Sequence, residues 1–211
     1  MNLYERNQKI RNFFNEKIDT YDDVHSSFME TKKALADHLD KDTINILDLG
    51  AGTGLELIYL FKLFPNAKVT VIDITENMLE KLKKREFSSN VNIICGDFFE
   101  VDFGKDYDAV ISTSALHHFK KEEKEKLYKK IIDCLKENGQ FINCDYIALT
   151  EEIENEQLYK LENNIDDFKH IDTPLTVKNE LGTLKKVGFK EIYTSNVDKS
   201  NYCLIKARKT N

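Results

Sequence analysis

The feature that most constrains this chain is a short apolar run that leads directly into three closely spaced glycines. Ile46 to Leu49 reads as a buried strand, and Gly50, Gly52 and Gly54 follow it at alternate positions. Glycine reaches positive φ angles at little steric cost and lets backbone amides approach a ligand closely. The dinucleotide fingerprint needs a glycine at position 55, where this chain has Leu55. The spacing therefore indicates a ligand-binding βα turn of another kind, with tight packing alone as the alternative.

From residue 44 onward, apolar strand-like runs alternate with stretches whose apolar residues recur every three or four positions. This alternation is typical of right-handed βαβ crossovers and a mostly parallel sheet. We predict an α/β fold with a doubly wound sheet of seven strands, at 44–49, 68–72, 91–95, 107–112, 139–146, 190–196 and 202–207. Helices are expected at 54–64, 76–87 and 122–137, where the Leu-Lys-Glu-Asn-Gly ending at Gly139 reads as a helix stop.

The segments around this pattern complete the predicted organisation. Only about five polar residues, 197–201, separate the last two strands, so these should pair as an antiparallel hairpin. Helical patterns also cover 3–17, 26–39 and 151–164, and no repeat or Pro/Gly/Ser linker marks a boundary. We therefore predict one domain over residues 1–211, with an N-terminal helical lid (1–42) and an α/β core (43–211) that carries a helical insert (151–175).

Composition limits the compartment and the partners. No apolar run approaches the roughly 18 residues that a membrane helix needs, and no apolar stretch near residue 1 reads as a signal peptide. We expect a cytoplasmic monomer or homodimer that contacts no membrane. The four cysteines are dispersed and form no CxxC pair, and the net charge of −6 disfavours nucleic acid as a partner.

Carboxylates follow the next two predicted strands. Asp73 ends the second strand beside the glycine turn, at the edge where α/β sheets bind ligands, and a carboxylate there can accept hydrogen bonds from both ribose hydroxyls. The alternative is that Asp73 caps the next helix, although Thr75 suits that role better. Asp97 and Phe98 follow the third strand and offer an acceptor for an adenine amine and a ring to cover the base.

The order and separation of these motifs, with the closing hairpin, resemble the class I S-adenosylmethionine (SAM)-dependent methyltransferases over almost the whole chain. The fourth strand, Tyr107 to Ser112, and the Leu-Lys-Glu-Asn-Gly-Gln-Phe-Ile around the fifth also look like family segments. Asp172 to Leu175, with the later Gly188 and Phe189, is similar to stretches of small bacterial methyltransferases of the ubiquinone-biosynthesis and tRNA-wobble-uridine types. The resemblance implies a Rossmann-like fold, SAM as the cofactor and S-adenosylhomocysteine (SAH) as its product.

The resemblance also implies the cofactor-binding residues, which are Asp48, Gly50, Ala51, Gly52, Asp73, Ile74, Met78, Asp97, Phe98 and Ser112. In this assignment the glycine turn passes the methionine part of SAM, with Asp48 supporting the turn from below. Asp73 takes the ribose hydroxyls, and Ile74 and Met78 flank the adenine. Asp97 and Phe98 bind its amine and face, and Ser112 lies near the amino acid part.

Transfer of an activated methyl group chiefly requires alignment of the acceptor and exclusion of water. If the acceptor must lose a proton, the candidate bases are His117, His118, Asp145 and His170, and we choose His118 and Asp145 as the catalytic residues. Capping or packing by the histidine pair is the alternative. We predict no metal site: Asp166, Asp167, His170 and Asp172 form a cluster of metal-ligand types, but a hydrated loop explains them equally. Aromatic residues of the helical segments either close over the site or anchor those helices; they are Tyr21, Phe28, Tyr159 and Phe168.

The sequence therefore predicts a SAM-dependent methyltransferase acting on a small-molecule acceptor through an oxygen or nitrogen nucleophile. Three other functions stay open. A nicotinamide-dependent oxidoreductase shares the glycine turn, but Leu55 and the terminal hairpin argue against it. A non-catalytic SAM-binding protein would keep the same loop, and an RNA methyl- or carboxymethyltransferase is disfavoured by the acidic balance and the Ser-Thr-Ser-Ala after the fourth strand.

Overall fold

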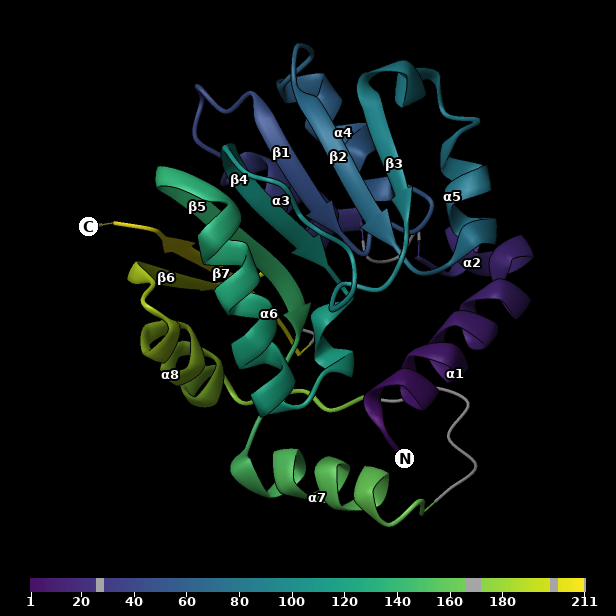
Figure 1. Ribbon diagram of the computed structural model, residues 1–211, viewed down its shortest axis with the longest axis vertical. Helices are drawn as coiled ribbons and strands as arrows, with labels where there is room; N and C mark the ends of the chain where they lie inside the picture. The colour runs from purple at the N-terminus through teal and green to yellow at the C-terminus, as the bar shows by residue number, and fades with distance from the viewer. Residues whose placement is uncertain (26–28, 166–171, 198–200, 211) are drawn as a thin grey trace.

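In the computed structural model, which describes residues 1–25, 29–165, 172–197 and 201–210, seven strands form one sheet in the order β3-β2-β1-β4-β5-β7-β6 (Figure 1). The first five strands run parallel, whereas β7 lies antiparallel to both β5 and β6. The strand bounds are β1 Asn45–Leu49, β2 Lys68–Asp73, β3 Val91–Cys95, β4 Tyr107–Thr113, β5 Leu135–Tyr146, β6 Lys190–Asn196 and β7 Tyr202–Arg208. The predicted seven-stranded fold and its antiparallel closing hairpin are confirmed.

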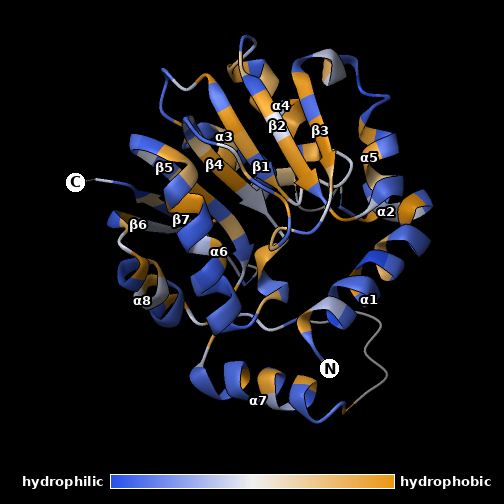
Figure 2. Cartoon of the chain, in the orientation of Figure 1, coloured by the Kyte–Doolittle hydropathy of each residue, from blue (hydrophilic) through white to orange (hydrophobic). Residues whose placement is uncertain are grey.

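Helices cover both faces of the sheet because successive strand residues point to opposite sides. On β1, Ile46 packs with Leu35 and Leu57 of helices α3 and α4, whereas Leu47 packs in a second core with Leu127 of α6. The helix bounds are α1 Leu3–Glu16, α2 Ile18–His25, α3 Met29–Asp37, α4 Leu55–Leu63, α5 Glu76–Leu82, α6 Lys121–Cys134, α7 Glu151–Glu162 and α8 Val177–Val187. Figure 2 shows the apolar strands between helices whose outer faces are polar. Among the described residues, no helix has the length and apolarity needed to cross a bilayer.

The structure corrects two predicted helix ends. The helix expected at 122–137 stops at Cys134, and the sheet resumes at Leu135, which pairs with Tyr107 of β4. The expected helix stop is therefore part of β5, in which Asn138 takes a φ of +62° and donates its amide hydrogen to Lys209. The helix expected at 76–87 ends at Leu82, and a separate 3₁₀ turn, η2, spans Glu86–Asn90.

Two helices were missing from the prediction. The N-terminal segment forms three helices rather than two, because α1 ends at Glu16 and α2 begins at Ile18; residues 26–28, where the second helix was expected to start, lie outside the described part. Helix α8 was not predicted, although its signals are present. Thr176 accepts a hydrogen bond from the Asn179 amide at its start, and Gly188, with a φ of +116°, ends it.

The strand order places the carboxyl ends of β1 and β4 side by side, at the point where the chain reverses the direction of strand addition. In an open α/β sheet, ligands bind at such a switch point. Figure 1 shows α1 passing across the carboxyl ends of the parallel strands, with α2 beside it. The N-terminal helices therefore lie over the edge of the sheet that carries the predicted site.

Candidate functional site

A cleft with about 620 Å³ of empty space, part of it open to solvent, lies at the carboxyl ends of the parallel strands. Its walls come from the loops after β1 to β4 on one side and from α1 and α2 on the other. Eight of the predicted site residues line it: Gly50, Gly52, Asp73, Ile74, Met78, Asp97, Phe98 and His118. Residues from the N-terminal helices also line it, namely Asn7, Ile10, Phe14 and Tyr21. Segments far apart in the chain thus form one cavity.

The glycine turn has a backbone conformation that residues other than glycine rarely adopt. Gly50, Gly52 and Gly54 have φ angles of +80°, +52° and +74°. A Cβ on Gly50 would also lie 2.4 Å from the Cβ of Ala115, which belongs to the loop after β4. Glycine at position 50 is therefore required both by the backbone angle and by the close approach of the neighbouring loop.

Asp73 ties the end of β2 to the glycine turn. Its Oδ2 accepts a hydrogen bond from the Gly52 amide at 2.8 Å, and its Oδ1 accepts one from the Thr75 amide at 2.7 Å. Asp73 is 8% exposed, and burial raises its pKa above the usual value. An ionised carboxylate has about four acceptor positions, and the Thr75 side chain also acts on this one, so capacity for a further donor remains. Asp73 therefore bonds the amide of Thr75, the residue just before α5, and the Thr75 side chain makes no cap hydrogen bond to the helix.

Asp97 connects the loop after β3 to the first helix of the chain. Its Oδ1 accepts a hydrogen bond from the Phe99 amide at 2.9 Å, and its Oδ2 accepts one from the Asn7 side-chain amide at 2.6 Å. Phe98 lies next to it in the cleft and makes an edge contact with Phe119, with ring centroids 5.9 Å apart. One wall of the cleft is therefore aromatic and carries a carboxylate at its rim.

Three predicted cofactor residues do not line the cleft, namely Ala51, Ser112 and Asp48. Ala51 is buried within the turn, and the Ser112 hydroxyl donates to the Leu49 carbonyl at 2.7 Å, which ties β4 to β1. The cleft instead reaches Ser114 and Ala115. Ser114 has a φ of +53°, because the chain turns sharply there.

Asp48 is fully buried behind the glycine turn, on the face of β1 covered by α3 and α4. Burial, and then the negative charge of Glu56, raise the pKa of Asp48 well above its usual range. Glu56 forms an ion pair with Lys32 of α3 at 3.3 Å, and the lysine also donates to Thr113 at 3.3 Å. Asp48 thus belongs to a buried ionic cluster that supports the turn from the far side of the cleft.

Helix α2 is fixed to the glycine turn. Asp22 accepts hydrogen bonds from the Thr53 hydroxyl at 2.6 Å and from Arg85 at 2.8 Å. This anchor places the Tyr21 hydroxyl 3.5 Å from the position that a Cβ of Gly52 would occupy. Burial and the nearby carboxylates, Glu56 first, raise the pKa of Tyr21 above its usual value. Tyr21 therefore presents a protonated hydroxyl to the cleft.

The other predicted lid residues are placed differently. Tyr159 of α7 is 61% exposed, and Phe28 and Phe168 lie outside the described residues. Of the described lid candidates, Tyr21 alone lines the cleft.

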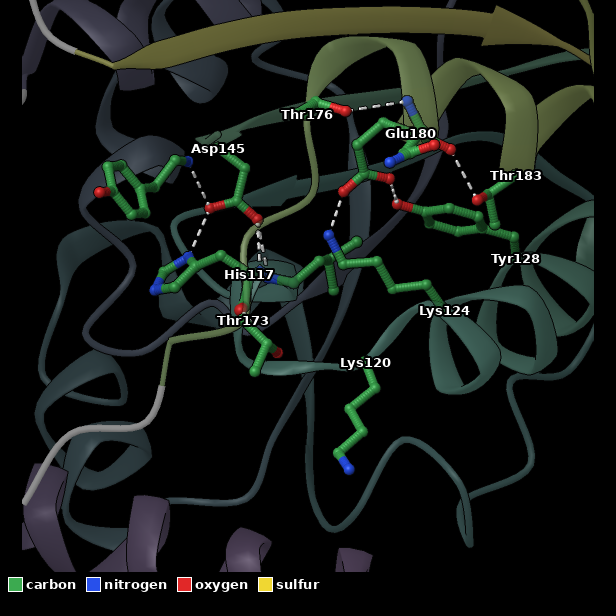
Figure 3. Close-up of polar contacts among 12 residues, drawn as sticks. His117, Lys120, Lys124, Tyr128, Asp145, Thr173, Thr176, Glu180 and Thr183 are labelled. Carbon is green, nitrogen blue, oxygen red and sulfur yellow. Dashed lines mark hydrogen bonds and ion pairs between the residues drawn. The ribbon is translucent and has the colours of Figure 1, made fainter. Parts of the chain in front are cut away.

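His117 and Asp145 form a tightly bonded pair at the ends of β4 and β5. His117 Nδ1 lies 2.6 Å from Asp145 Oδ1, and Oδ2 accepts hydrogen bonds from the Leu116 and His117 amides at 2.9 Å each. The Tyr146 amide also donates to Oδ1, at 2.8 Å. Figure 3 shows the Asp145 carboxylate between the His117 ring and the backbone. Burial alone would lower the pKa of His117, but Asp145 and Asp172 outweigh it and raise the pKa to about 9.

Asp172 lies close to both His117 and His118. Its Oδ1 lies 3.3 Å from His117 Nε2 and 3.4 Å from His118 Nδ1. His118, which we predicted as the base, lines the cleft, and its ring makes an edge contact with Phe14 of α1 at a centroid distance of 5.9 Å. The ring bonded to Asp145 is that of His117. Of the other cluster residues, Asp166, Asp167 and His170 lie outside the described part.

A second buried network lies beside this pair and fixes α6 against α8. Glu180 of α8 forms an ion pair with Lys124, and it accepts a hydrogen bond from the Tyr128 hydroxyl at 2.7 Å (Figure 3). Both Lys124 and Glu180 are buried. Lys124 is paired with Glu180 and therefore holds α6 against α8.

The sequence predicted an N-terminal lid, but the residues through which α1 contacts the site were missed. Asn7 is buried and donates to Asp97, and Arg6 is buried and forms an ion pair with Glu123 at the start of α6. The available signal was an asparagine one helical turn before Ile10, on the face that packs inward. Polar residues on an inward face require partners, and these partners lie about 90 and 117 residues further along the chain.

Known proteins share this domain. A family model described as a methyltransferase domain matches residues 46–139. The malonyl-[acyl-carrier protein] O-methyltransferase of Priestia megaterium is 33% identical over 130 residues, which cover 59% of this chain and 47% of that protein. The chain therefore spans about half the length of this relative. The carboxy-S-adenosyl-L-methionine synthase of Nautilia profundicola is 28% identical over 197 residues, covering 85% of this chain and 79% of the other.

Solved structures share the fold at low sequence identity. A putative O-methyltransferase from Nostoc punctiforme superposes with a TM-score of 0.75 and 23% identity, covering 93% of this chain and 60% of that one. Human N-acetylserotonin methyltransferase, solved in complex with SAM, superposes with a TM-score of 0.72 and 22% identity, covering 94% and 56%. The sheet order and the terminal hairpin are thus those of known methyltransferases.

Proposed function

We propose that this chain is a class I SAM-dependent methyltransferase, which transfers the methyl group of SAM to an oxygen or nitrogen atom of a small-molecule acceptor; the matching methyltransferase family model, the relatives and the shared fold support this. One observation carries the proposal. The glycine turn, Asp73 and Asp97 share a single cleft with His118, Phe14 and Tyr21. A cofactor site and an acceptor site would then lie within one cavity, which methyl transfer requires.

The residues present fit SAM. Asp73 lines the cleft with acceptor capacity beyond its two backbone hydrogen bonds, and we assign the ribose hydroxyls to it. Ile74, Met78 and Phe98 supply apolar surface for the adenine, and Asp97 supplies an acceptor for its amine. The methionine part would lie along Gly50 and Gly52, beneath Tyr21.

When bound, SAM supplies an activated methyl group, so the protein has to align the acceptor and exclude water. Ile10, Phe14 and Tyr21 close the cleft from the N-terminal helices and perform the second task. His118 stands on the cleft wall and is the member of the histidine pair that meets the proton-bearing atom of the acceptor. Asp145 acts through His117, whose ring it orients, and is therefore a positioning residue.

One relative favours a second candidate function. The carboxy-S-adenosyl-L-methionine synthase matches this chain over most of both lengths. An activity of that kind would change the mass of the cofactor instead of methylating an acceptor. Mass spectrometry of the SAM recovered from incubations with small carboxylic acids would detect it, and unchanged SAM in every mixture would reject it.

The proposal is tested first by calorimetric titration with SAM, SAH and NAD in parallel. We expect SAM and SAH to bind at one site per chain and NAD not to bind. SAH release would then be followed over a panel of small phenols, amines and carboxylic acids. Binding of NAD alone, or of none of the three, would overturn the proposed function.

A further inference from the structure

We propose that His117, His118 and Asp172 form a binding site for one divalent transition-metal ion at the edge of the cleft. Each residue offers a ligand atom, and these three atoms lie within 4.8 Å of one another. The two histidines come from the 3₁₀ turn η3, Leu116–His118, and Asp172 comes from the segment that leads to α8. The chain fold, and not a local motif, brings the three residues together.

The spacing of the ligand atoms matches a metal site better than direct hydrogen bonding. Asp172 Oδ1 lies 3.3 Å from His117 Nε2 and 3.4 Å from His118 Nδ1. Charge-assisted N–H···O bonds are shorter, about 2.7 to 2.9 Å. Ligands bonded at about 2.0 to 2.2 Å around one tetrahedral ion stand roughly 3.3 Å apart. The two imidazole nitrogens lie within 4.8 Å of each other, so an ion bonded to all three atoms would draw the two rings together.

The contact of His117 with Asp145 supports the metal site independently. Metal-bound histidines usually donate their other ring N–H to a carboxylate, which fixes the ring and its tautomer. Asp145 has this position at His117 Nδ1, 2.6 Å away, and three backbone amides hold its own oxygens. His117 Nε2 is thereby directed toward Asp172. This is the arrangement that a ligating histidine needs.

Charge and burial point in the same direction. The His117 and Asp145 side chains are 6% and 5% exposed, and Asp172 is 31% exposed. Two carboxylates thus share a largely buried region with two imidazoles, and a divalent cation that displaced the proton from His117 Nε2 would balance both negative charges. Lys124 also acts on Asp145, but its charge is paired with Glu180.

The donor set selects the class of ion. Imidazole nitrogens suit Zn²⁺, Fe²⁺ and Ni²⁺, whereas Mg²⁺ and Ca²⁺ prefer sets made only of oxygen ligands. Three protein ligands leave at least one position for another group. His118 lines the cleft, so that position would face the acceptor. On the proposed function, the ion would bind the acceptor oxygen and lower the pKa of its hydroxyl group, whose proton would pass to solvent water before the oxygen takes the methyl group.

The experiment is a calorimetric titration of the full chain, freed of metal with a chelator, with Zn²⁺, Mn²⁺ and Mg²⁺ in turn. We expect one Zn²⁺ per chain, weaker binding of Mn²⁺ and none of Mg²⁺. His117→Ala and Asp172→Asn should each weaken Zn²⁺ binding more than tenfold. His38→Ala, which removes a half-buried histidine of α3's C-terminal turn, and Cys95→Ser, which removes the exposed thiol, should leave it unchanged.

A spectroscopic measurement on the unmodified chain tests the metal site without relying on variants that could fold poorly. Co²⁺ added to the unmodified chain should give visible absorption bands of a site with nitrogen ligands, and Zn²⁺ should displace them. Stoichiometric Zn²⁺ binding that survives Asp172→Asn, or the absence of Zn²⁺ and Co²⁺ binding, would overturn the metal site. SAH titration of the same samples separates the two proposals: retained SAH binding with no metal binding rejects only the metal site, whereas lost SAH binding in the unmodified chain rejects the proposed function.

Discussion

The two sides of the cleft are built in different ways. On the cofactor side, the turn after β1 and Asp73 meet through backbone amides, and the bonded residues lie within about 20 positions of each other. On the acceptor side, His117 meets Asp145 and Asp172 across 28 and 55 positions, and Phe14 of α1 closes over His118. The first side depends on backbone geometry that a short motif specifies. The second depends on side chains that only the complete fold assembles.

This difference predicts which substitutions should damage each side of the cleft. The cofactor side should fail when its backbone support or its single ribose carboxylate is removed. On the acceptor side, loss of one contact should leave the domain folded, because the residues extend from strand ends that the sheet already fixes. The same loss should lower turnover. The substitutions below separate stability, cofactor affinity and turnover on this basis.

The largest effect is expected for Lys32→Met, behind the glycine turn. Lys32 is 2% exposed, and its ammonium group is paired with Glu56 beside the buried Asp48. Its removal leaves buried carboxyl groups without a cation, and we expect the free energy of unfolding to fall by about 3 kcal/mol. Urea denaturation measures this value. Lys33→Met, at the exposed neighbouring position, should change it by less than about 0.5 kcal/mol, and equal effects of the two substitutions would contradict the supporting role of the cluster.

Asp73→Ala tests the cofactor side itself. The substitution removes the two bonds that hold Gly52 and Thr75 and the acceptor assigned to the ribose. We expect SAH affinity to fall about 100-fold, the loss of two bonds to a charged acceptor. Calorimetry gives the affinity, and a thermal melt checks that the domain still folds. The exposed Asp133→Ala on α6 is the matched control; normal SAH binding by Asp73→Ala would show that the ribose lies elsewhere.

Asp145→Asn should affect turnover and spare cofactor binding. An amide in place of the carboxylate removes the negative charge that holds the His117 ring in its orientation. We expect turnover to drop by about 10- to 100-fold, with SAH affinity within about twofold of the unmodified chain. SAH release with the acceptor found by screening measures the first quantity. A parallel loss of SAH affinity would mean that the two sides of the cleft are not separable.

The smallest effect is expected for Asn7→Ala, at the contact between the lid and the cofactor side. The lost hydrogen bond to Asp97 should cost about 1 kcal/mol, or roughly a fivefold loss of SAH affinity. Lys9→Ala, on the exposed face of the same helix, provides the comparison in the same titration. Unchanged affinity in Asn7→Ala would assign α1 to the acceptor side alone.

Local signals account for the parts of the structure that were predicted well. The bounds of β3 and β6 match their predicted ranges. β3 is a mainly apolar run, and β6 carries Ile192, Tyr193 and Thr194, residue types that strands favour. The helix over 122–137 was predicted too long, since the sheet pairing of Leu135 with Tyr107 overrides a local preference. Helix α8 was missed even though its cap and its closing glycine stand in the sequence.

The sequence by itself determined the strand–glycine turn, the carboxylates after β2 and β3, and the closing hairpin, because each depends on residues that are neighbours or on a loop of fixed length. Only the tertiary structure decided that His117, and not His118, pairs with Asp145, that Asp172 joins them, and that Asn7 reaches Asp97. Two adjacent histidines look alike in a sequence. Which ring faces the strand end and which faces the cleft depends on the direction in which the 3₁₀ turn leaves β4, and packing of the whole domain sets that direction.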